Sequence, residues 1–221
     1  AAFHEWVAFI DDDCVAQSNW ILEMKKTILN HPNAAIIGRS ETFFPINLFA
    51  VAARFHELQW KMPAIRGNRV TDLEILDTKN IVFNNVFLKT HSLRFNESKP
   101  YGRYWTNDDI DFGMQLWKVG GKARYNPAMI VYHKDATTLR GFWKKTWEDT
   151  ISYELYQKKW HAERIQIEKL RRALSSKDIM ILVKHTYHPS FFFLLSLQCL
   201  LFVSSIFIRV TRKYALIKYP R

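Results

Sequence analysis

The chain has 221 residues, of which 48% are hydrophobic and 15% aromatic, and its formal net charge is +11. This composition supports a buried core and excludes extensive disorder, while two cysteines are too few for a disulfide framework. The positive charge is concentrated in residues 140–221, which hold 16 Lys and Arg against 6 Asp and Glu. A basic C-terminal third suits either an anionic membrane surface or nucleic acid.

The first predicted element is a strand over residues 6–10, which runs directly into Asp11, Asp12 and Asp13. Three adjacent carboxylates repel one another and cannot be buried unpaired. Oxygen ligands of this kind suit Mg²⁺ or Mn²⁺. The triplet therefore predicts a cation site for a phosphate-bearing substrate, with a solvated acidic turn as the alternative.

Short apolar segments bounded by turn residues follow the triplet and predict alternating helices and strands. They are a helix over 19–29, a strand over 34–37 ending at Gly38, a helix after Pro45 within 43–60, a mobile loop over 65–76, and a strand or buried helix start over 81–88.

A second acidic cluster, Asp108, Asp109 and Asp111, begins a helix predicted over 108–119 and ended by two glycines. Thr106 and Asp109 have the spacing of a capping box, and acids in a first turn favour the helix dipole. Three acidic residues are nevertheless more than are needed to cap the N-terminus of one helix. A carboxylate at this position is expected to stay ionised at neutral pH, as a general base must. A capping role and a catalytic role are both open.

A strand is predicted over 128–132, opened by Pro127 and ended by His133. A histidine at a strand end can ligate a metal ion through one ring nitrogen. A lone histidine is more often structural, so His133 by itself does not indicate a metal site.

Two helices are predicted in the basic third of the chain. The first covers 141–174 and carries an apolar stripe with tryptophans among basic residues, which suits a bilayer interface or ordinary packing on the domain. The second contains 18 uncharged residues, 191–208, followed directly by basic residues. This length is the lower limit for a membrane span, so we expect a span or a deeply inserted helix, with a buried core helix as the alternative.

Taken together, these motifs resemble the family 2 glycosyltransferases of the GT-A fold over residues 5–135. The matching segments are Phe9 to Asp13, Asp108 to Phe112, Val119-Gly120-Gly121, and Tyr125-Asn126-Pro127 through His133. Thr78-Lys79-Asn80 resembles the Thr-Gly-Asn of that family, with lysine in place of glycine. The resemblance implies an α/β, GT-A-like domain with a mixed sheet.

The resemblance also implies roles for individual residues. Asp11 and Asp13 resemble the Asp-x-Asp pair that holds Mn²⁺ or Mg²⁺ and the diphosphate of a nucleotide sugar, with Asp12 beside them. His133 resembles an additional metal ligand, and Asp109 resembles the base that deprotonates the acceptor hydroxyl, with inversion at the anomeric carbon. Acceptor-side positions would be Asn80, Asp108 and Asp111.

This interpretation predicts three regions: a catalytic domain over 1–139, a basic interfacial helix region over 140–178 and a membrane-associated segment over 179–221. Because the family's first β-α units have no counterpart here, we expect an N-terminally truncated enzyme. The expected partners are a nucleoside-diphosphate sugar, a carbohydrate or lipid-linked acceptor such as a surface polysaccharide, and an anionic membrane surface, but no nucleic acid. We expect the catalytic domain on the cytoplasmic face of a membrane.

Two other functions fit parts of the sequence. Phe9 to Val15 also matches the nucleophile motif of haloacid-dehalogenase-like phosphatases, with Asp11 as the nucleophile and Asp13 as the acid/base. In that case Asp108 and Asp109 would be a later metal pair. The basic C-terminal third is also compatible with a non-catalytic protein that binds membranes or nucleic acid.

Overall fold

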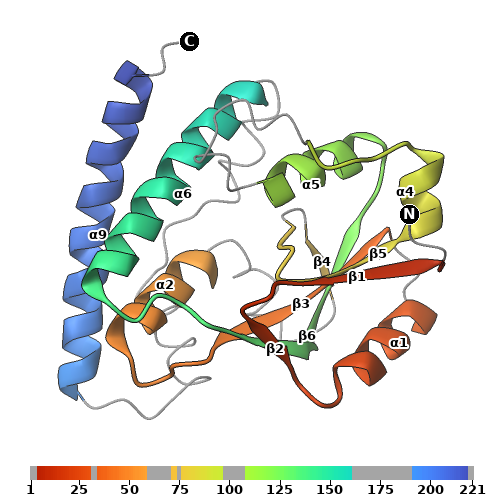
Figure 1. Cartoon of the computed structure of the whole chain (residues 1–221), viewed down its shortest axis with the longest axis horizontal. Helices are drawn as coiled ribbons and strands as arrows, with labels where there is room; N and C mark the ends of the chain where they lie inside the picture. The colour runs from red at the N-terminus through yellow and green to blue at the C-terminus, as the bar shows by residue number, and fades with distance from the viewer. Residues whose placement is uncertain are drawn as a thin grey trace. The chain divides into compact units, whose positions relative to one another are not determined.

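The computed structural model describes residues 4–30, 34–58, 71–73, 76–96, 108–160 and 191–218 (Figure 1). The chain divides into two compact units. The first, here the sheet unit, comprises Ala1–Phe43, Lys61–Glu97 and Asp108–Lys134. The second, here the helical unit, comprises Phe44–Trp60, Ser98–Asn107 and Asp135–Arg221.

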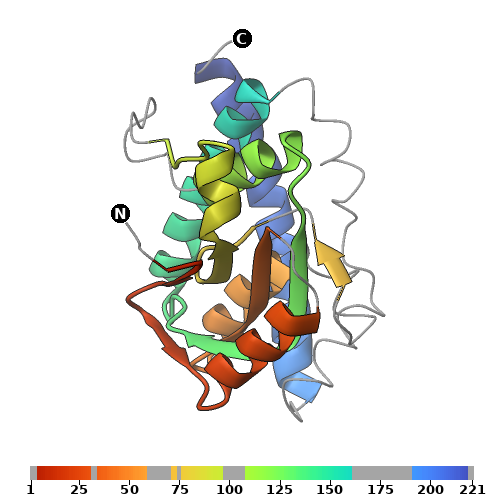
Figure 2. The ribbon, with the colours of Figure 1, turned by 90° about the vertical axis from the view of Figure 1, so that its right-hand side faces the viewer.

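The sheet unit contains one mixed sheet, as the sequence predicted. Its strands are β1 (Trp6–Ile10), β2 (Cys14–Ala16), β3 (Ala35–Thr42), β4 (Thr71–Leu73), β5 (Asn80–Asn84) and β6 (Ala123–His133). The strand order is β1-β5-β3-β6-β2, and β4 pairs with the start of β6 (Figure 2). β3 and β6 are parallel, whereas the other pairs are antiparallel.

Apolar side chains alternate along the central strands and form a core on each face of the sheet. On one face, Ile36 and Val82 pack with Trp20 of helix α1 (Trp20–Asn30). On the other face, Ile37 and Phe83 pack with residues of helix α5 (Asp108–Lys118). The predicted strand 6–10 and the helices 19–29 and 108–119 are therefore confirmed to within a residue or two.

Two strands are longer than the sequence predicted. β3 continues past Gly38 to Thr42, and β6 begins at Ala123 rather than at residue 128. The register between them shifts after Gly38, which pairs with Asn126, whereas Arg39 pairs with Ile130. Pro127 lies in the segment that this shift leaves out of the ladder, where its missing N–H costs no hydrogen bond. The sequence predicted a strand that starts at Pro127, because proline is rarely found inside a strand, whereas β6 contains it at this irregular position.

Two central predictions were also refined. The segment 81–88 is a strand followed by a helix, because Asn84 ends β5 and caps helix α4 (Asn85–Thr90) by accepting from the N–H of Phe87. Within the predicted loop 65–76, Thr71–Leu73 form β4. Residues 65–70, 74 and 75 lie outside the described residues.

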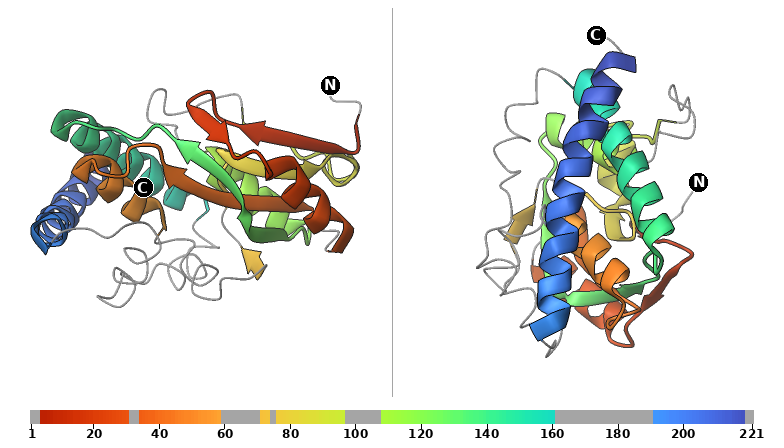
Figure 3. Two further views of the ribbon diagram at one scale, coloured as in Figure 1. Left: turned by 90° about the horizontal axis from the view of Figure 1, so that it is seen from below. Right: turned by 90° about the vertical axis from the view of Figure 1, so that its left-hand side faces the viewer.

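The helical unit contains α2 (Leu48–Leu58), α6 (Leu139–Lys159) and α9 (Phe191–Lys218). α9 runs beside α6 and α2 (Figure 3). α6 ends at Lys159, and residues 161–174 of the predicted helix lie outside the described part of the chain. The predicted boundaries at 139 and 178 stay predictions, although α2, from inside the predicted first domain, belongs to the helical unit.

The apolar stripe of α6 packs against α9. Ile151 and Leu155 are buried with Ala215, and Trp147 lies against this cluster. This contact corresponds to ordinary helix packing, the alternative to a stripe that faces a bilayer. Among the described residues, α9 is the helix long and apolar enough to cross a membrane, with a mean hydropathy of 2.0 over 18 residues.

Candidate functional site

The acidic triplet forms the turn between β1 and β2. The Cys14 N–H donates to the carbonyl of Asp11 at 3.0 Å, which closes this turn. β2 then pairs with the end of β6, so that Cys14 lies opposite His133, and the Lys134 N–H donates to the carbonyl of Asp13 at 3.0 Å. His133 Nε2 is consequently 3.4 Å from Asp13 Oδ2. Two of the three predicted metal ligands are therefore brought together by strand pairing.

A lysine–aspartate pair lies beside the triplet. Ile10 at the end of β1 pairs with Asn80 at the start of β5, which places Asp11 near Lys79. Lys79 Nζ is 3.5 Å from Asp77 Oδ1, and the same oxygen accepts the Lys79 backbone N–H at 3.2 Å. Sequence reasoning did not single out Asp77. Its position two residues before a lysine and three residues before a buried strand was the available signal.

Asp109 approaches the same pair from α5. A side-chain carbon added at Gly113 would lie 3.0 Å from Leu76, so the helix packs closely on the residue that precedes Asp77. The pKa of Asp109 is raised to about 7, mainly because its carboxyl is removed from water and secondly because of the negative charge of Asp77. The Lys79 ammonium opposes both effects. A carboxyl with this pKa is only partly ionised at neutral pH, whereas the sequence predicted a carboxylate that stays ionised, because burial outweighs the effect of the helix terminus.

Asp11 has the same two neighbours. Burial is the main cause that raises the pKa of its carboxyl, and Asp77 and Asp13 add to the effect. Lys79 and His133 lower this pKa. Asp11 and Asp109 thus share Asp77 and Lys79, which links the triplet to α5 in one electrostatic cluster at one end of the sheet.

The donor set of this cluster suits a hard cation. Asp11, Asp13 and His133 offer carboxylate oxygens and one imidazole nitrogen, which are ligands for Mg²⁺ or Mn²⁺. Burial is the main cause of the raised pKa of Asp11, and a bound cation would stabilise the charged form of this carboxyl. Within the described residues, no three His, Cys, Asp or Glu side chains already surround a common point. Because Mg²⁺ and Mn²⁺ usually keep several oxygen ligands from water or phosphate, the substrate or water would supply the other ligands of a cation bound here.

Cys14 borders the cluster but stays uncharged. Burial, followed by the charges of Asp13 and Asp11, raises the pKa of its thiol to about 12. The thiol Sγ lies 3.8 Å from Asp13 Oδ1. Because thiolate is the reactive form, Cys14 is not a nucleophile in this environment.

Asn80, predicted on the acceptor side, has a structural role in the sheet. Its Nδ2 donates to the carbonyls of Arg39 and Met129, each at 2.8 Å, and its Oδ1 accepts the Trp20 indole N–H at 2.8 Å. It fills the gap opened by the register shift between β3 and β6, and only a glycine at position 38 leaves room for it. The side chain is fully buried, so this geometry gives no support to the predicted contact with an acceptor.

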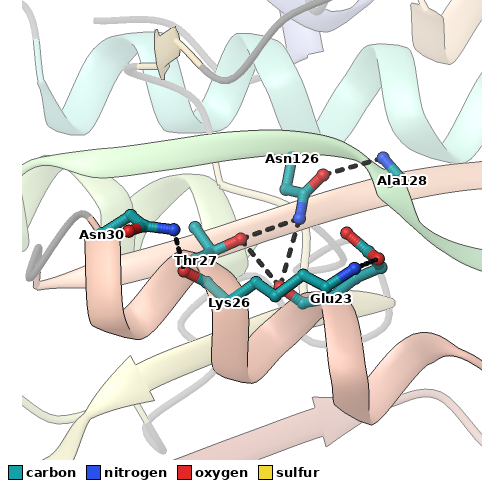
Figure 4. A network of polar contacts seen from close by, with 6 residues as sticks. All are labelled: Glu23, Lys26, Thr27, Asn30, Asn126 and Ala128. Carbon is teal, nitrogen blue, oxygen red and sulfur yellow. Dashed lines mark hydrogen bonds and ion pairs between the residues drawn. The ribbon is translucent and has the colours of Figure 1, made fainter.

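Asn126, from the Asn-Pro motif, fastens the same irregular segment to α1 (Figure 4). Its Nδ2 donates to Thr27 Oγ1 at 2.7 Å and to the carbonyl of Glu23 at 3.3 Å. Its Oδ1 accepts the N–H of Ala128 at 2.8 Å. The motif therefore fixes the part of β6 that leads to His133.

The remaining predicted residues differ in exposure. Asp12 is exposed at the turn, whereas Asp111 is buried and its Oδ2 accepts from Gln115 Nε2 at 3.4 Å. Asp108 Oδ1 accepts the Asp109 N–H at 3.1 Å, and Asp109 Oδ1 accepts the Ile110 N–H at 2.8 Å. These bonds satisfy N–H groups of the first turn, as capping requires. Thr106 of the predicted capping box lies outside the described residues.

The site thus combines the predicted Asp11, Asp13, His133 and Asp109 with Asp77 and Lys79, two residues to which the sequence analysis gave no role. The polar residues that support it are Asn80 and Asn126. No protein-family model matches this chain, and no curated protein is significantly similar to it.

Proposed function

We propose that the protein is a metal-dependent, inverting glycosyltransferase of the GT-A-like family 2 type. It would move a sugar from a nucleoside-diphosphate sugar to an acceptor hydroxyl. The observation that carries the proposal is that Asp11 and Asp109 share the Lys79–Asp77 pair at one end of the sheet. Asp13 and His133, which lie 3.4 Å apart, are near Asp11.

Asp109 is suited to the role of general base. A carboxyl group with a pKa of about 7 is partly ionised at neutral pH and accepts a proton more strongly than an ordinary aspartate. In the proposed reaction Asp109 takes the proton of the acceptor hydroxyl as its oxygen attacks the anomeric carbon. The bond between that carbon and the diphosphate oxygen breaks, and the nucleoside diphosphate leaves with the bonding electrons.

Asp11, Asp13 and His133 are the residues that would hold Mn²⁺ or Mg²⁺. When bound, such a cation supplies positive charge that neutralises the departing diphosphate. Lys79 adds a second positive charge on the Asp77 side of the cluster, where the family pattern has glycine. The positive charge of Lys79 is compatible with an anionic leaving group. Its side chain also takes up space near the acceptor position that a glycine would leave open.

The substrates follow from the same chemistry. A cation held by carboxylates favours a donor that carries a diphosphate, and a carboxyl base favours a hydroxyl acceptor. The apolar helix α9 favours an acceptor at a membrane, such as a lipid-linked glycan or a growing polysaccharide. The identities of the sugar and the acceptor do not follow from these residues.

The test is turnover of a panel of nucleotide sugars by the full-length protein in detergent or vesicles, with released nucleoside diphosphate as the readout. We expect turnover with Mn²⁺ or Mg²⁺, its loss in EDTA, and at least a hundredfold decrease for Asp109→Asn. Asp149→Asn removes an aspartate of α6 outside the sheet unit and should leave turnover unchanged.

Two results would overturn the proposal. The first is Asp109→Asn with undiminished sugar transfer, which would remove the base from the mechanism. The second is a covalent aspartyl phosphate on Asp11 after incubation with a phosphate monoester, which would favour the phosphatase alternative. Absence of turnover with every donor would favour the non-catalytic alternative.

A further inference from the structure

Helix α9 exposes a continuous apolar stripe. The helix has 28 residues, which corresponds to about 42 Å at 1.5 Å per residue. Its exposed apolar side chains recur at helical spacing from one end to the other. They are Phe192, Leu195, Phe202, Val203, Ile206, Val210 and Ile217. Exposure reaches 77% at Phe192 and 80% at Ile217, so the stripe is open over the whole length of the helix.

The opposite side of α9 is covered by protein. Leu197, Ser204 and Thr211 are fully buried and lie seven residues apart, on one side of the helix. Ser204 Oγ is 2.9 Å from His56 Nε2 of α2. Further along, the contacts are with α6. They are the ring pairs Trp143–Phe207 at 4.7 Å and Trp147–Tyr214 at 5.2 Å, and the ion pair of Arg212 with buried Glu154.

The charged surface of α6 limits how deep this assembly can lie. Arg140, Lys144 and Lys145 are exposed, and Asp149 Oδ1 is 3.0 Å from Lys145 Nζ. Charged side chains of this kind are unfavourable in the hydrocarbon of a bilayer. The part of α9 that packs against α6, from Phe207 to Ala215, therefore cannot pass through the hydrocarbon with lipid on all sides.

The remaining part of α9 is too short to cross a membrane. Residues 191–206 are 16 residues and reach about 24 Å, whereas the hydrocarbon is about 30 Å thick. Ser204 in this part also contacts His56 of α2. We therefore infer that α9 lies in the plane of the membrane surface, with its apolar stripe in the bilayer and with α2 and α6 on its water-facing side.

An anionic bilayer is the partner that fits this stripe. The exposed Arg209, Lys213 and Lys218 accompany it along the C-terminal half, where they would meet lipid phosphates. A second copy fits less well. Parallel packing of two stripes would place these cations against each other, and antiparallel packing would place them against apolar residues such as Leu195.

The inference is tested by depth-dependent quenching in vesicles of phosphatidylcholine and phosphatidylglycerol at 3:1. A fluorophore is attached at Leu195→Cys, Phe202→Cys or Val210→Cys in a chain that carries Cys14→Ser and Cys199→Ser. Nitroxides placed near the headgroup or near the acyl end report depth. We expect all three positions to be quenched mainly by the shallow nitroxide and to the same extent. Lys144→Cys on α6 is the control and should not be quenched.

Deep quenching at position 202 with shallow quenching at 195 and 210 would instead show a spanning helix. Absence of quenching at all three, with crosslinking between copies, would show that a second chain covers the stripe.

Vesicle binding by the unlabelled double variant Phe202→Ser, Val210→Ser is a second test, which does not depend on correct folding of the labelled chains. We expect binding to fall at least tenfold, whereas Leu139→Ser, which removes an exposed apolar residue of α6, should bind like the parent. Unchanged binding by the double variant would contradict the inference. Sugar transfer is not measured, so the outcome is independent of the proposed function.

Discussion

Replacing Asp109 with asparagine should stabilise the protein at high pH. The fold raises the pKa of this carboxyl from 3.8 to about 7, so the folded chain binds more protons than the unfolded chain between these values. Stability attributable to Asp109 is therefore complete below about pH 4 and falls as the pH rises through about 7. A difference of about 3 pH units at about 1.4 kcal/mol each gives an upper limit of about 4 kcal/mol. Because the residue is partly exposed, we expect about 2 kcal/mol at pH 8.

The assay is thermal unfolding of the full chain in detergent micelles with EDTA, followed by circular dichroism at pH 5 and pH 8. EDTA matters because a bound divalent cation would lower the pKa of nearby carboxyls. We expect Asp109→Asn to melt only slightly above the parent at pH 5, where about a third of the effect has developed, and about 4–8 °C higher at pH 8. Asp149→Asn, whose carboxyl forms an exposed ion pair with Lys145, should show no such dependence on pH. An Asp109→Asn chain that melts below the parent at pH 8, or equally at both pH values, would refute the burial argument.

Three further predictions concern Lys79 and His133 of the acidic cluster and Asn80 of the sheet. Lys79→Met removes the ammonium that lowers the pKa of Asp109. The acidic limb of the pH profile of kcat/KM should therefore move to higher pH by about half a unit or more. An unchanged profile would show that Lys79 does not influence the catalytic base. His133→Gln should weaken Mn²⁺ binding at least about tenfold by titration calorimetry, and unaltered binding would leave His133 a structural residue. Asn80→Ala leaves two buried carbonyls and an indole N–H without their bonds, so we expect a loss of about 3 kcal/mol in denaturant unfolding. A loss below about 1 kcal/mol would argue against its role in the sheet.

The resemblance and the geometry assign different roles to the motif residues. Asn80 and Asn126 lie in motifs that suggested chemistry, yet both satisfy backbone groups around the register shift between β3 and β6. This could not be predicted from the sequence, because the register shift depends on the pairing of two strands that lie more than eighty residues apart in the chain. Asp77 was overlooked for a similar reason, since its importance comes from its neighbours in space.

The helices and strands were largely predictable because their periodicity and turn residues are local properties of the chain. The acidic triplet, the acidic start of α5 and the uncharged run in α9 were also visible in the sequence, since each is a continuous segment. The tertiary structure alone decided that Asp11 and Asp109 share Asp77 and Lys79, and that α6 and α2 cover one side of α9. Both results depend on burial and on distances between remote segments. Those quantities set the pKa of Asp109 and the depth that α9 can reach, and they arise only when the segments pack together.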